Sequence, residues 1–353
     1  MSRDSEAGLA ALLIDWQRQH GRHSLPWQQT RDPYRVWLSE IMLQQTQVST
    51  VLGYYARFLA RFPDVAALAA APLDEVLALW AGLGYYSRAR NLHRCAQAVV
   101  RDFGGQFPPS AAQLATLPGI GRSTAAAVAA FCFGERVAIL DGNVKRVLTR
   151  VLGFGEDLAQ TAVERRLWAV AEAQLPPAGA GVEAYTQGLM DLGATVCTPR
   201  QPSCLLCPWQ ARCVARQQGQ PEAYPVKTRK LKRGQRAHAL LWLSCGDAVF
   251  LVQRPATGVW AGLWTLPEFD DVAGLQAWLA TGPGEGEVLP RFTHVLTHLD
   301  LLLTPVRVRL PAGSALAQGP LLRWPEGRWV SRAELANHGL PAPVRKLLDA
   351  AAD

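Results

Sequence analysis

The chain has 353 residues, 49% of them hydrophobic, a formal net charge of +7 and a pI near 9.2. This length predicts roughly two domains that each bury a core, and the hydrophobic content excludes wholesale disorder. Apolar runs stay below the roughly 18 residues of a membrane helix, and the first residues lack a signal-peptide pattern. We therefore expect a cytoplasmic protein without membrane contact, whose positive charge suits a polyanionic partner or simply favours solubility.

The second of the first two predicted helices contains an acidic residue in an otherwise apolar sequence. Residues 9–19 are expected to form one helix. After a loop, Asp32 as N-cap and Pro33 at the first position start a second helix that extends to about Leu52. This helix is apolar on most of its circumference, yet Glu40 lies in its middle. A buried carboxyl has a raised pKa and can donate a proton near neutrality, although a Glu in this pattern more often reaches solvent or a salt bridge.

A glycine-rich segment with two tyrosines follows further helical sequence. In GLGYY, residues 82–86, Tyr85 and Tyr86 stand close to Arg88 and Arg90. Aromatic rings beside guanidinium groups suit base stacking and phosphate contact. Aromatic residues that close a helix junction are an equally good interpretation.

Two motifs occupy the centre of the chain. In LPGIG, residues 117–121, the glycines turn the backbone between two helical segments. Such a hairpin offers backbone N–H groups to a phosphate, although alone it also fits an ordinary turn between helices. In LDGNVKRV, residues 140–147, Asp141 begins a helix, and its simplest role is an N-cap. A capped carboxylate also stays ionised and fixed, as needed to stabilise a positively charged sugar.

These motifs resemble those of the helix-hairpin-helix DNA glycosylases, and their amino-acid sequences are similar to those of the MutY-type adenine DNA glycosylases. SEIMLQQTQV, residues 39–48, resembles the signature segment of that family and places its catalytic acid at Glu40. The resemblance implies that Glu40 protonates the departing adenine and that Asp141 stabilises the oxocarbenium-like sugar. Asn143 is expected to support Asp141 by a hydrogen bond. The resemblance spans residues 9–349 in several motifs.

The resemblance also implies contacts with the base and with DNA. Trp27, Leu43 and Gln187 are expected to line the adenine pocket. DNA contacts are implied for Gln44, Tyr85, Gly119, Gly121, Ser123, Lys145, Thr297 and His298. Endonuclease III-like enzymes carry a lysine that attacks the sugar where this chain has Ser123. The resemblance therefore implies a monofunctional glycosylase with little lyase activity, and at most weak trapping through Lys145.

Four of the seven cysteines fall together. Cys197, Cys204, Cys207 and Cys213 have the spacing C-x6-C-x2-C-x5-C. This grouping indicates metal binding, because disulfides are disfavoured in a reducing compartment. The spacing alone does not choose between zinc and an iron–sulfur cluster. It resembles the [4Fe-4S] loop of the endonuclease III superfamily, which implies a cluster at residues 197–213 that has no open position for substrate.

The pattern changes after residue 225. Residues 226–236 contain six basic residues and no acid, as expected for a basic linker that is solvated or touches phosphate. The segments 239–243 and 248–252 then read as strands, and the Gly246-Asp247 pair between them is a hairpin signal. Ser331-Arg-Ala-Glu334 predicts a capping box at the start of a short helix.

Residues 237–350 resemble the C-terminal Nudix-like domain of the same family. The run of metal-binding glutamates that a Nudix hydrolase needs does not occur, which favours recognition of the opposing 8-oxoguanine over nucleotide hydrolysis. Where the contact loop of the family has Phe-Ser-His, this chain has Leu296-Thr297-His298. The hydroxyl is kept and the aromatic ring is lost, so the chain departs from the family at a position that bears on how strongly 8-oxoguanine is recognised. His294 and His298 are equally compatible with ordinary strand histidines.

The sequence therefore predicts a mainly α helix-hairpin-helix glycosylase domain with an iron–sulfur loop (residues 1–225), a basic linker (226–236) and an α+β Nudix-like domain (237–353). The expected activity is base excision repair of adenine paired with 8-oxoguanine or guanine, after base flipping. The expected partner is double-stranded DNA that contains A·8-oxoguanine or A·G mispairs, bound by a monomer. The alternatives are another glycosylase of this fold, for mismatched thymine or oxidised pyrimidine, and a non-catalytic iron–sulfur DNA-binding protein.

Overall fold

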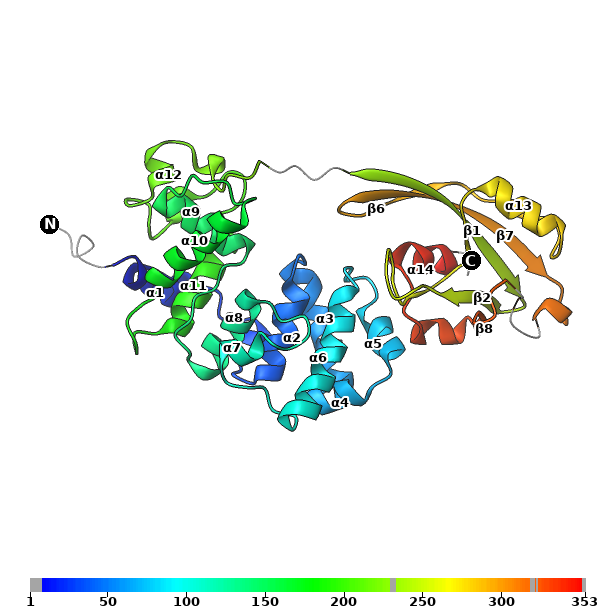
Figure 1. Ribbon diagram of the computed structural model, residues 1–353, viewed down its shortest axis with the longest axis horizontal. Helices are drawn as coiled ribbons and strands as arrows, with labels where there is room; N and C mark the ends of the chain where they lie inside the picture. Colours follow the sequence, from blue (N-terminus) through cyan, green and yellow to red (C-terminus); the bar gives the residue numbers. More distant parts are fainter. Residues whose placement is uncertain (1–7, 229–232, 318–320, 322, 351–353) are drawn as a thin grey trace. The chain divides into compact units, whose positions relative to one another are not determined.

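The computed structural model describes residues 8–228, 233–317, 321 and 323–350. The predicted linker at 226–236 includes residues 229–232, which lie outside the described residues. The chain divides into two compact units (Figure 1). The first unit comprises the described residues of 1–55, 64–66 and 94–230, and the second those of 56–63, 67–93 and 231–353. The domain boundaries drawn from the sequence stay predictions.

Between residues 8 and 223 the described elements are all helices. They are α1 (Leu9–His20), η2 (Pro26–Gln28), α2 (Pro33–Leu43), α3 (Val48–Arg61), α4 (Val65–Ala70), α5 (Leu73–Trp80), α6 (Ser87–Phe103), α7 (Ala111–Leu114), α8 (Arg122–Phe133), α9 (Gly142–Leu152), α10 (Thr161–Ala173), α11 (Val182–Thr195), η3 (Cys204–Leu206), α12 (Val214–Gln217) and η4 (Pro221–Ala223). In the part of the chain that is described, no helix has the length and apolar character to cross a membrane.

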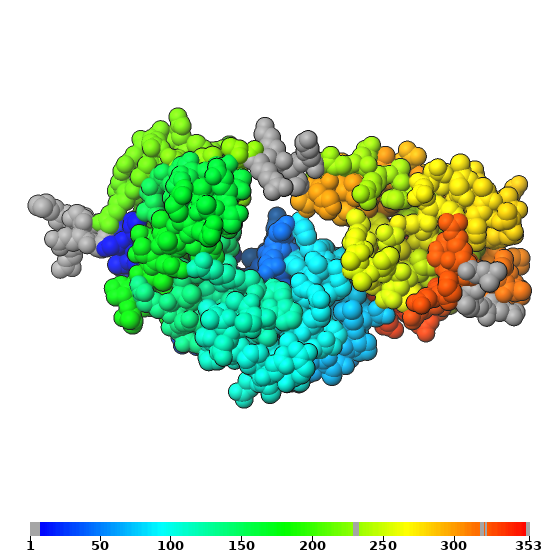
Figure 2. Space-filling view, in the orientation of Figure 1, coloured from blue at the N-terminus to red at the C-terminus, as the bar shows by residue number. Residues whose placement is uncertain are grey.

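The core of the first unit forms where apolar residues recur at helical spacing. On α9 these residues are Val144, Val147, Leu148 and Val151, all at most 3% exposed. They belong to one cluster with buried side chains of α1 and α11. In Figure 2 the blue residues of α1 lie against green residues of α11, although the two helices are far apart in the sequence. This packing brings the two ends of the helical region together.

The predicted helix boundaries follow from local chemistry. Asp32 accepts a hydrogen bond from the Tyr34 backbone N–H at 2.9 Å, and Pro33 occupies the first position of α2. Gly134 ends α8 in the left-handed conformation, with φ 67°. The predicted cap at Asp32 is confirmed.

The described residues of the second unit form an eight-stranded sheet. Its strands and helices beyond residue 233 are β1 (Gly234–Cys245), β2 (Ala248–Gln253), β3 (Trp264–Thr265), β4 (Glu268–Phe269), α13 (Val272–Ala280), β5 (Glu287–Val288), β6 (Phe292–Val295), β7 (Leu299–Leu310), η5 (Ala315–Ala317), β8 (Arg328–Ser331), η6 (Ala333–Asn337) and α14 (Ala342–Asp349). The strand order is β3-β2-β1-β7-β5, with β4 paired to β1, β6 to β7 and β8 to β2. The predicted strands are therefore confirmed.

The long strands β1 and β7 run parallel in the centre of this sheet, from the pair Gly234 and Leu299 to the pair Cys245 and Leu310. The predicted hairpin at Gly246-Asp247 joins β1 to the antiparallel β2. The capping box is also present, because the Ser331 hydroxyl donates to the Glu334 carboxylate at 2.8 Å and accepts from its backbone N–H. The fold class expected from the sequence, a mainly α region followed by an α+β region, is confirmed.

Candidate active site

A cleft of about 1280 Å³ lies within the first unit. Its walls come from η2, the segment between α2 and α3, the first turns of α8 and α9, and α11. The predicted site residues that line it are Trp27, Glu40, Leu43, Gln44, Ser123, Asp141, Asn143 and Gln187. The structure thus brings both predicted catalytic carboxylates and all three predicted base contacts into one cleft.

Glu40 lies on α2 between buried neighbours and has one side towards the cleft. Burial and, to a smaller extent, the charge of Asp141 raise the pKa of Glu40 to about 8. The carboxyl is therefore protonated at neutral pH and can donate its proton to a group in the cleft. The raised pKa expected from the sequence is confirmed, while catalysis by Glu40 stays a prediction.

Asp141 is the N-cap of α9. Its Oδ1 accepts a hydrogen bond from the Val144 backbone N–H at 2.7 Å, which confirms the predicted cap. A half-buried carboxyl with a raised pKa and a capped carboxyl group thus stand in the same cleft, and glycosidic bond cleavage uses a pair of such acidic groups.

Asn143 is held by a different partner from the one expected. Its Oδ1 accepts from Arg146 Nη2 at 2.8 Å, and no hydrogen bond to Asp141 occurs among the described residues. Arg146, 8% exposed, also donates to the carbonyl oxygens of Gly193 and Cys197, at 2.6 and 2.7 Å. A Cβ at Gly193 would lie 2.8 Å from that of Asn143, so only glycine allows this approach of α11 to α9. Asn143 is positioned through Arg146.

The helix predicted from Tyr34 to Leu52 is interrupted. Helix α2 ends at Leu43, and α3 begins at Val48. Between them Gln45 adopts a left-handed conformation, with φ 57°, and the whole segment lines the cleft. Its sequence contains no Gly or Pro, so local signals did not reveal the break. The interruption puts Gln44 at the cleft wall, where its Nε2 lies 3.5 Å from Thr124 Oγ1.

The predicted glycine hairpin is present before α8. Gly119 has φ 76°, a left-handed conformation that favours glycine, and Gly121 is the N-cap of α8. Neither glycine lines the cleft, whereas Ser123 does. The Ser123 Oγ accepts from the Leu140 backbone N–H at 3.0 Å. This bond ties the hairpin to the residue that precedes Asp141.

Lys145 is not brought into the cleft. Its ammonium group forms an ion pair with Glu164, and it is absent from the cleft lining. The described residues that line the cleft include no lysine. Contact between Lys145 and an abasic product therefore requires the ion pair to break.

Gln28 is a cleft residue that sequence reasoning missed. It follows Trp27, which is 7% exposed and packs edge-on against Tyr55 with 5.3 Å between ring centroids. The Gln28 Oε1 accepts from the Leu25 backbone N–H at 3.3 Å, while its Nε2 is buried and has no hydrogen-bond partner among the described residues. A buried donor without a partner is costly unless a ligand satisfies it. The sequence carries no signal for this, since Gln28 stands in a polar loop.

A second group of predicted DNA-contacting residues meets in the second unit. The Tyr85 hydroxyl lies 2.7 Å from Thr297 Oγ1, although the two residues are 212 positions apart. Tyr85 has φ 48° and is 43% exposed, so the ring stands at the surface. Thr297 and the exposed His298 occupy the turn between β6 and β7. His294 instead packs with Trp260, with 5.8 Å between ring centroids, as a strand histidine does.

The four clustered cysteines surround one small cavity in the first unit. All are free of disulfides, and Arg150 holds the loop by donating to Cys197 Sγ at 3.4 Å and to the Thr198 carbonyl at 2.7 Å. Burial, and then the neighbouring cysteines, raise the pKa of the Cys207 thiol to about 12. Among the described residues, no group of three or more His, Cys, Asp or Glu side chains is placed to hold a single metal ion. Four thiols around one cavity are a donor set that suits either zinc or a metal–sulfur cluster.

Comparison with protein families gives two matches. Residues 38–173 match the model of the HhH-GPD superfamily of base excision DNA repair proteins, and residues 238–350 match that of the NUDIX domain. The adenine DNA glycosylase of Buchnera aphidicola subsp. Acyrthosiphon pisum is 34% identical over 341 residues, which cover 96% of both chains. The human adenine DNA glycosylase is also 34% identical, over 95% of this chain and 72% of the human protein.

Solved structures resemble the helical region. A thermostable thymine-DNA glycosylase matches with a TM-score of 0.53 and 29% identity, over 59% of this chain and 95% of that one. Endonuclease III in a non-covalent complex with DNA matches with a TM-score of 0.50 and 21% identity, over 62% of this chain and 99% of that one. The second likeness concerns the fold alone, and both agree with the helix-hairpin-helix arrangement around the cleft.

Proposed function

The chain belongs to the adenine DNA glycosylase family, and on this premise we propose that it hydrolyses the N-glycosidic bond of adenine paired with 8-oxoguanine or guanine in double-stranded DNA. The observation that carries the proposal is the cleft in which a protonated Glu40 and a capped Asp141 stand together. A non-catalytic DNA-binding protein has no need of an acid whose pKa is raised to about 8.

The two carboxyl groups divide the reaction between them. Glu40 donates its proton to a ring nitrogen of adenine, and the electron pair of the N-glycosidic bond leaves with the base. The sugar develops positive charge, which the Asp141 carboxylate stabilises. Water adds to the sugar carbon, and the Glu40 carboxylate accepts the proton that this water loses. The products are free adenine and an abasic site, and Glu40 is protonated again.

Base flipping is part of the proposal. The bond cannot be reached inside a duplex, so the nucleotide has to leave the stack and enter the cleft. A volume of about 1280 Å³ exceeds the usual size of a small-molecule pocket, which suits a nucleotide together with flanking backbone. Trp27, Leu43 and Gln187 are the side chains that we expect around the base, and Gln44 is expected to fill the space it leaves.

Other residues are proposed to hold and read the DNA. The hairpin with Gly119 and Gly121 stands at the N-terminus of α8 and suits a phosphate. Tyr85 and Thr297 form an exposed polar pair that suits contact with the opposite base. The net charge of +7 favours a polyanion. We expect a monomer that acts in the cytoplasm.

The cysteine loop is proposed to hold a [4Fe-4S] cluster through Cys197, Cys204, Cys207 and Cys213. When bound, the cluster supplies four cross-links within one loop and no open position for substrate. Arg146 connects the Cys197 carbonyl to Asn143, so an ordered loop also fixes the cleft. Purified protein is expected to absorb visible light and to contain about four iron atoms per chain; a colourless protein loaded with zinc would exclude the cluster.

We propose a monofunctional enzyme. A lyase needs an amine that attacks the sugar, and the described lining of the cleft has none. The nearby Lys145 is engaged by Glu164. Strand cleavage is therefore expected only after treatment with alkali.

The test is single-turnover base release from A·8-oxoguanine, A·G, A·T and G·T duplexes, followed by alkali. The proposal expects release from the first two and a much slower reaction on A·T. Release of thymine from G·T would instead support the activity named for the solved thymine-DNA glycosylase. Absence of release from every duplex would contradict the proposed function.

A further inference from the structure

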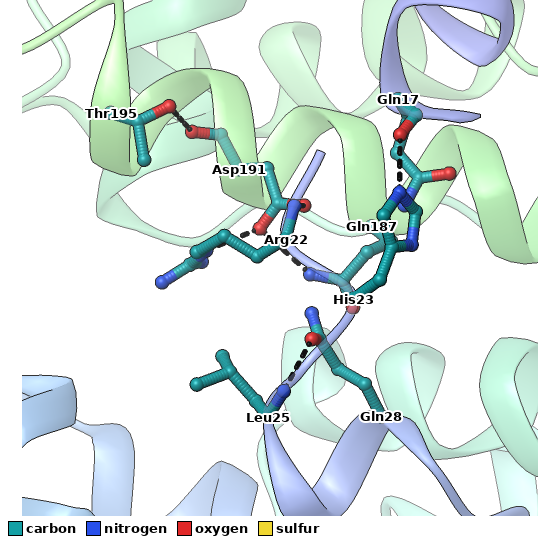
Figure 3. Close-up of polar contacts among 8 residues, drawn as sticks. All are labelled: Gln17, Arg22, His23, Leu25, Gln28, Gln187, Asp191 and Thr195. Carbon is teal, nitrogen blue, oxygen red and sulfur yellow. Dashed lines mark hydrogen bonds and ion pairs between the residues drawn. The ribbon is translucent and has the colours of Figure 1, made fainter. Parts of the chain in front are cut away.

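Asp191 is a buried acidic side chain that the proposed reaction does not use. It lies on α11, is 1% exposed and is surrounded by three donor groups (Figure 3). Its Oδ2 accepts from the Arg22 backbone N–H at 3.0 Å. Its Oδ1 accepts from Arg22 Nε at 2.7 Å and from Gln187 Nε2 at 2.9 Å. The buried charge is thus paired with a cation and hydrogen bonded on both oxygens, as a buried carboxylate requires.

This arrangement fixes the direction of the Gln187 amide. An amide has one donor end and one acceptor end, whereas an ionised carboxylate can only accept. Rotation of the amide by half a turn would set its oxygen against the Asp191 carboxylate and leave that charge short of a donor. The Gln187 Oε1 therefore points away from Asp191. It has no hydrogen-bond partner in the part of the chain that is described, and Gln187 lines the cleft.

The amide of Gln28 is fixed in the opposite sense. Its oxygen is held by the Leu25 backbone N–H, and its Nε2 is the buried donor without a partner among the described residues. Gln28 and Gln187 line the same cleft. The cleft wall therefore contains one oriented acceptor, on Gln187, and one buried oriented donor without a protein partner among the described residues, on Gln28.

We propose that Asp191, held by Arg22, is a positioning residue that makes the cleft selective for a 6-amino purine over a 6-oxo purine. Adenine presents a donor, its 6-amino group, next to a ring-nitrogen acceptor, which matches an acceptor at Gln187 and a donor at Gln28. Guanine and hypoxanthine present an oxygen at the same place, which would face the Gln187 oxygen and leave both unsatisfied. This inference rests on the proposed function, and it adds the group that sets the choice of base.

A rescue experiment separates orientation from a merely structural role. Asp191→Asn puts a donor beside Gln187 and permits its amide to turn. Gln187→Glu combined with Asp191→Asn keeps the total charge of the pair and gives residue 187 an acceptor on both oxygens, so its direction no longer matters. The readout is the ratio of single-turnover rates on adenine and on hypoxanthine, each opposite 8-oxoguanine. The second readout is the ratio of binding affinities for the same two bases, measured with duplexes that carry 2′-fluoro nucleotides, whose glycosidic bond is slow to break.

We expect the ratio to fall about tenfold in Asp191→Asn, roughly the effect of one misdirected hydrogen bond in a closed site, and to recover in the double variant. A double variant no better than the single one, or a wild-type protein that treats both bases alike, would overturn the inference. If Asp191→Asn does not fold, Arg22→Met is used, which keeps the carboxylate and two of its three hydrogen bonds and removes its cation. Its ratio is expected to fall about threefold, and an unchanged ratio counts against the inference.

The two readouts separate the two proposals. Normal adenine release with a ratio that is insensitive to residue 191 would refute the positioning role and leave the glycosylase in place. Selective binding of the adenine duplex without release of any base would refute the proposed function and leave the positioning role.

Discussion

The cleft of the first unit and the polar pair of the second unit hold their side chains in different ways. In the cleft, Asp141 is fixed by the first turn of α9, and Asn143 by the buried Arg146. The Tyr85 hydroxyl, in contrast, meets Thr297 on a side chain that is 43% exposed. Charges in an enclosed site act strongly on their neighbours, whereas exposed hydrogen bonds exchange readily with water. Substitutions in the cleft should therefore change the rate by orders of magnitude, and those at the pair only the preference for the opposite base.

The largest effect is expected from Glu40→Gln. Loss of a general acid should lower single-turnover adenine release about 10³-fold while DNA binding persists. The wild-type rate should be level below about pH 8 and fall above it, because only protonated Glu40 donates and its pKa is raised to about 8. The residual rate of the variant should lack this fall. A variant that retains turnover would exclude Glu40 as the acid.

Asp141→Asn is expected to cost about 10²-fold in rate, because it removes the negative charge that stabilises the sugar. Asparagine is a good N-cap, so α9 should still form and the protein should unfold at nearly the same temperature. The charge of Asp141 also helps to raise the pKa of Glu40, so the fall in rate should move to lower pH in the variant. An unmoved pH profile would show that the two carboxyl groups act independently.

The cleft also shows how much of the site could be predicted from the sequence. Caps at Asp32 and Asp141 and the left-handed Gly119 were predictable, because each depends on a few adjacent residues. The break at Gln45 was not, since no glycine or proline marks it and only its place in the cleft accounts for it. The remaining features of the cleft depend on contacts between residues that are far apart in the sequence.

The hydrogen bonds around Asp191 show the same limit of prediction from sequence. Its contact with Gln187 is an i, i+4 pair that a helical reading could have found. Arg22, 169 residues away, gives no such signal, and the ring of partners around the carboxylate exists only once α1 packs on α11. Local motifs therefore identified the chemical groups, and tertiary packing decides which end of each group faces the cleft.

The cleft should also impose a cost in stability that the exposed pair does not. The pKa of Glu40 in the folded protein is about 8, above its ordinary value of 4.5, so the folded state holds this proton more tightly. Its contribution to stability is full below about pH 4.5 and is lost as the pH rises towards 8, at up to about 1.4 kcal/mol per pH unit. In urea unfolding, the free energy of unfolding of Glu40→Gln should rise relative to that of the wild type as the pH increases across this range. Parallel pH dependences would mean that Glu40 is already ionised in the folded protein.

The smallest effects are expected from Tyr85→Phe and Thr297→Val. Each variant removes one hydroxyl and keeps the shape of the side chain, and the Arg88 guanidinium stays 5.5 Å from the centre of the ring at position 85. Because the hydroxyls bond each other at the surface, either change should alter the free energy of unfolding by less than about 1 kcal/mol. We expect the ratio of rates on A·8-oxoguanine and A·G to fall about threefold in each variant and no further in the double variant, as for one hydrogen-bonded unit. Additive losses would mean that the hydroxyls contact DNA separately, and a 10²-fold loss on both duplexes would show that this surface is as tightly constrained as the cleft.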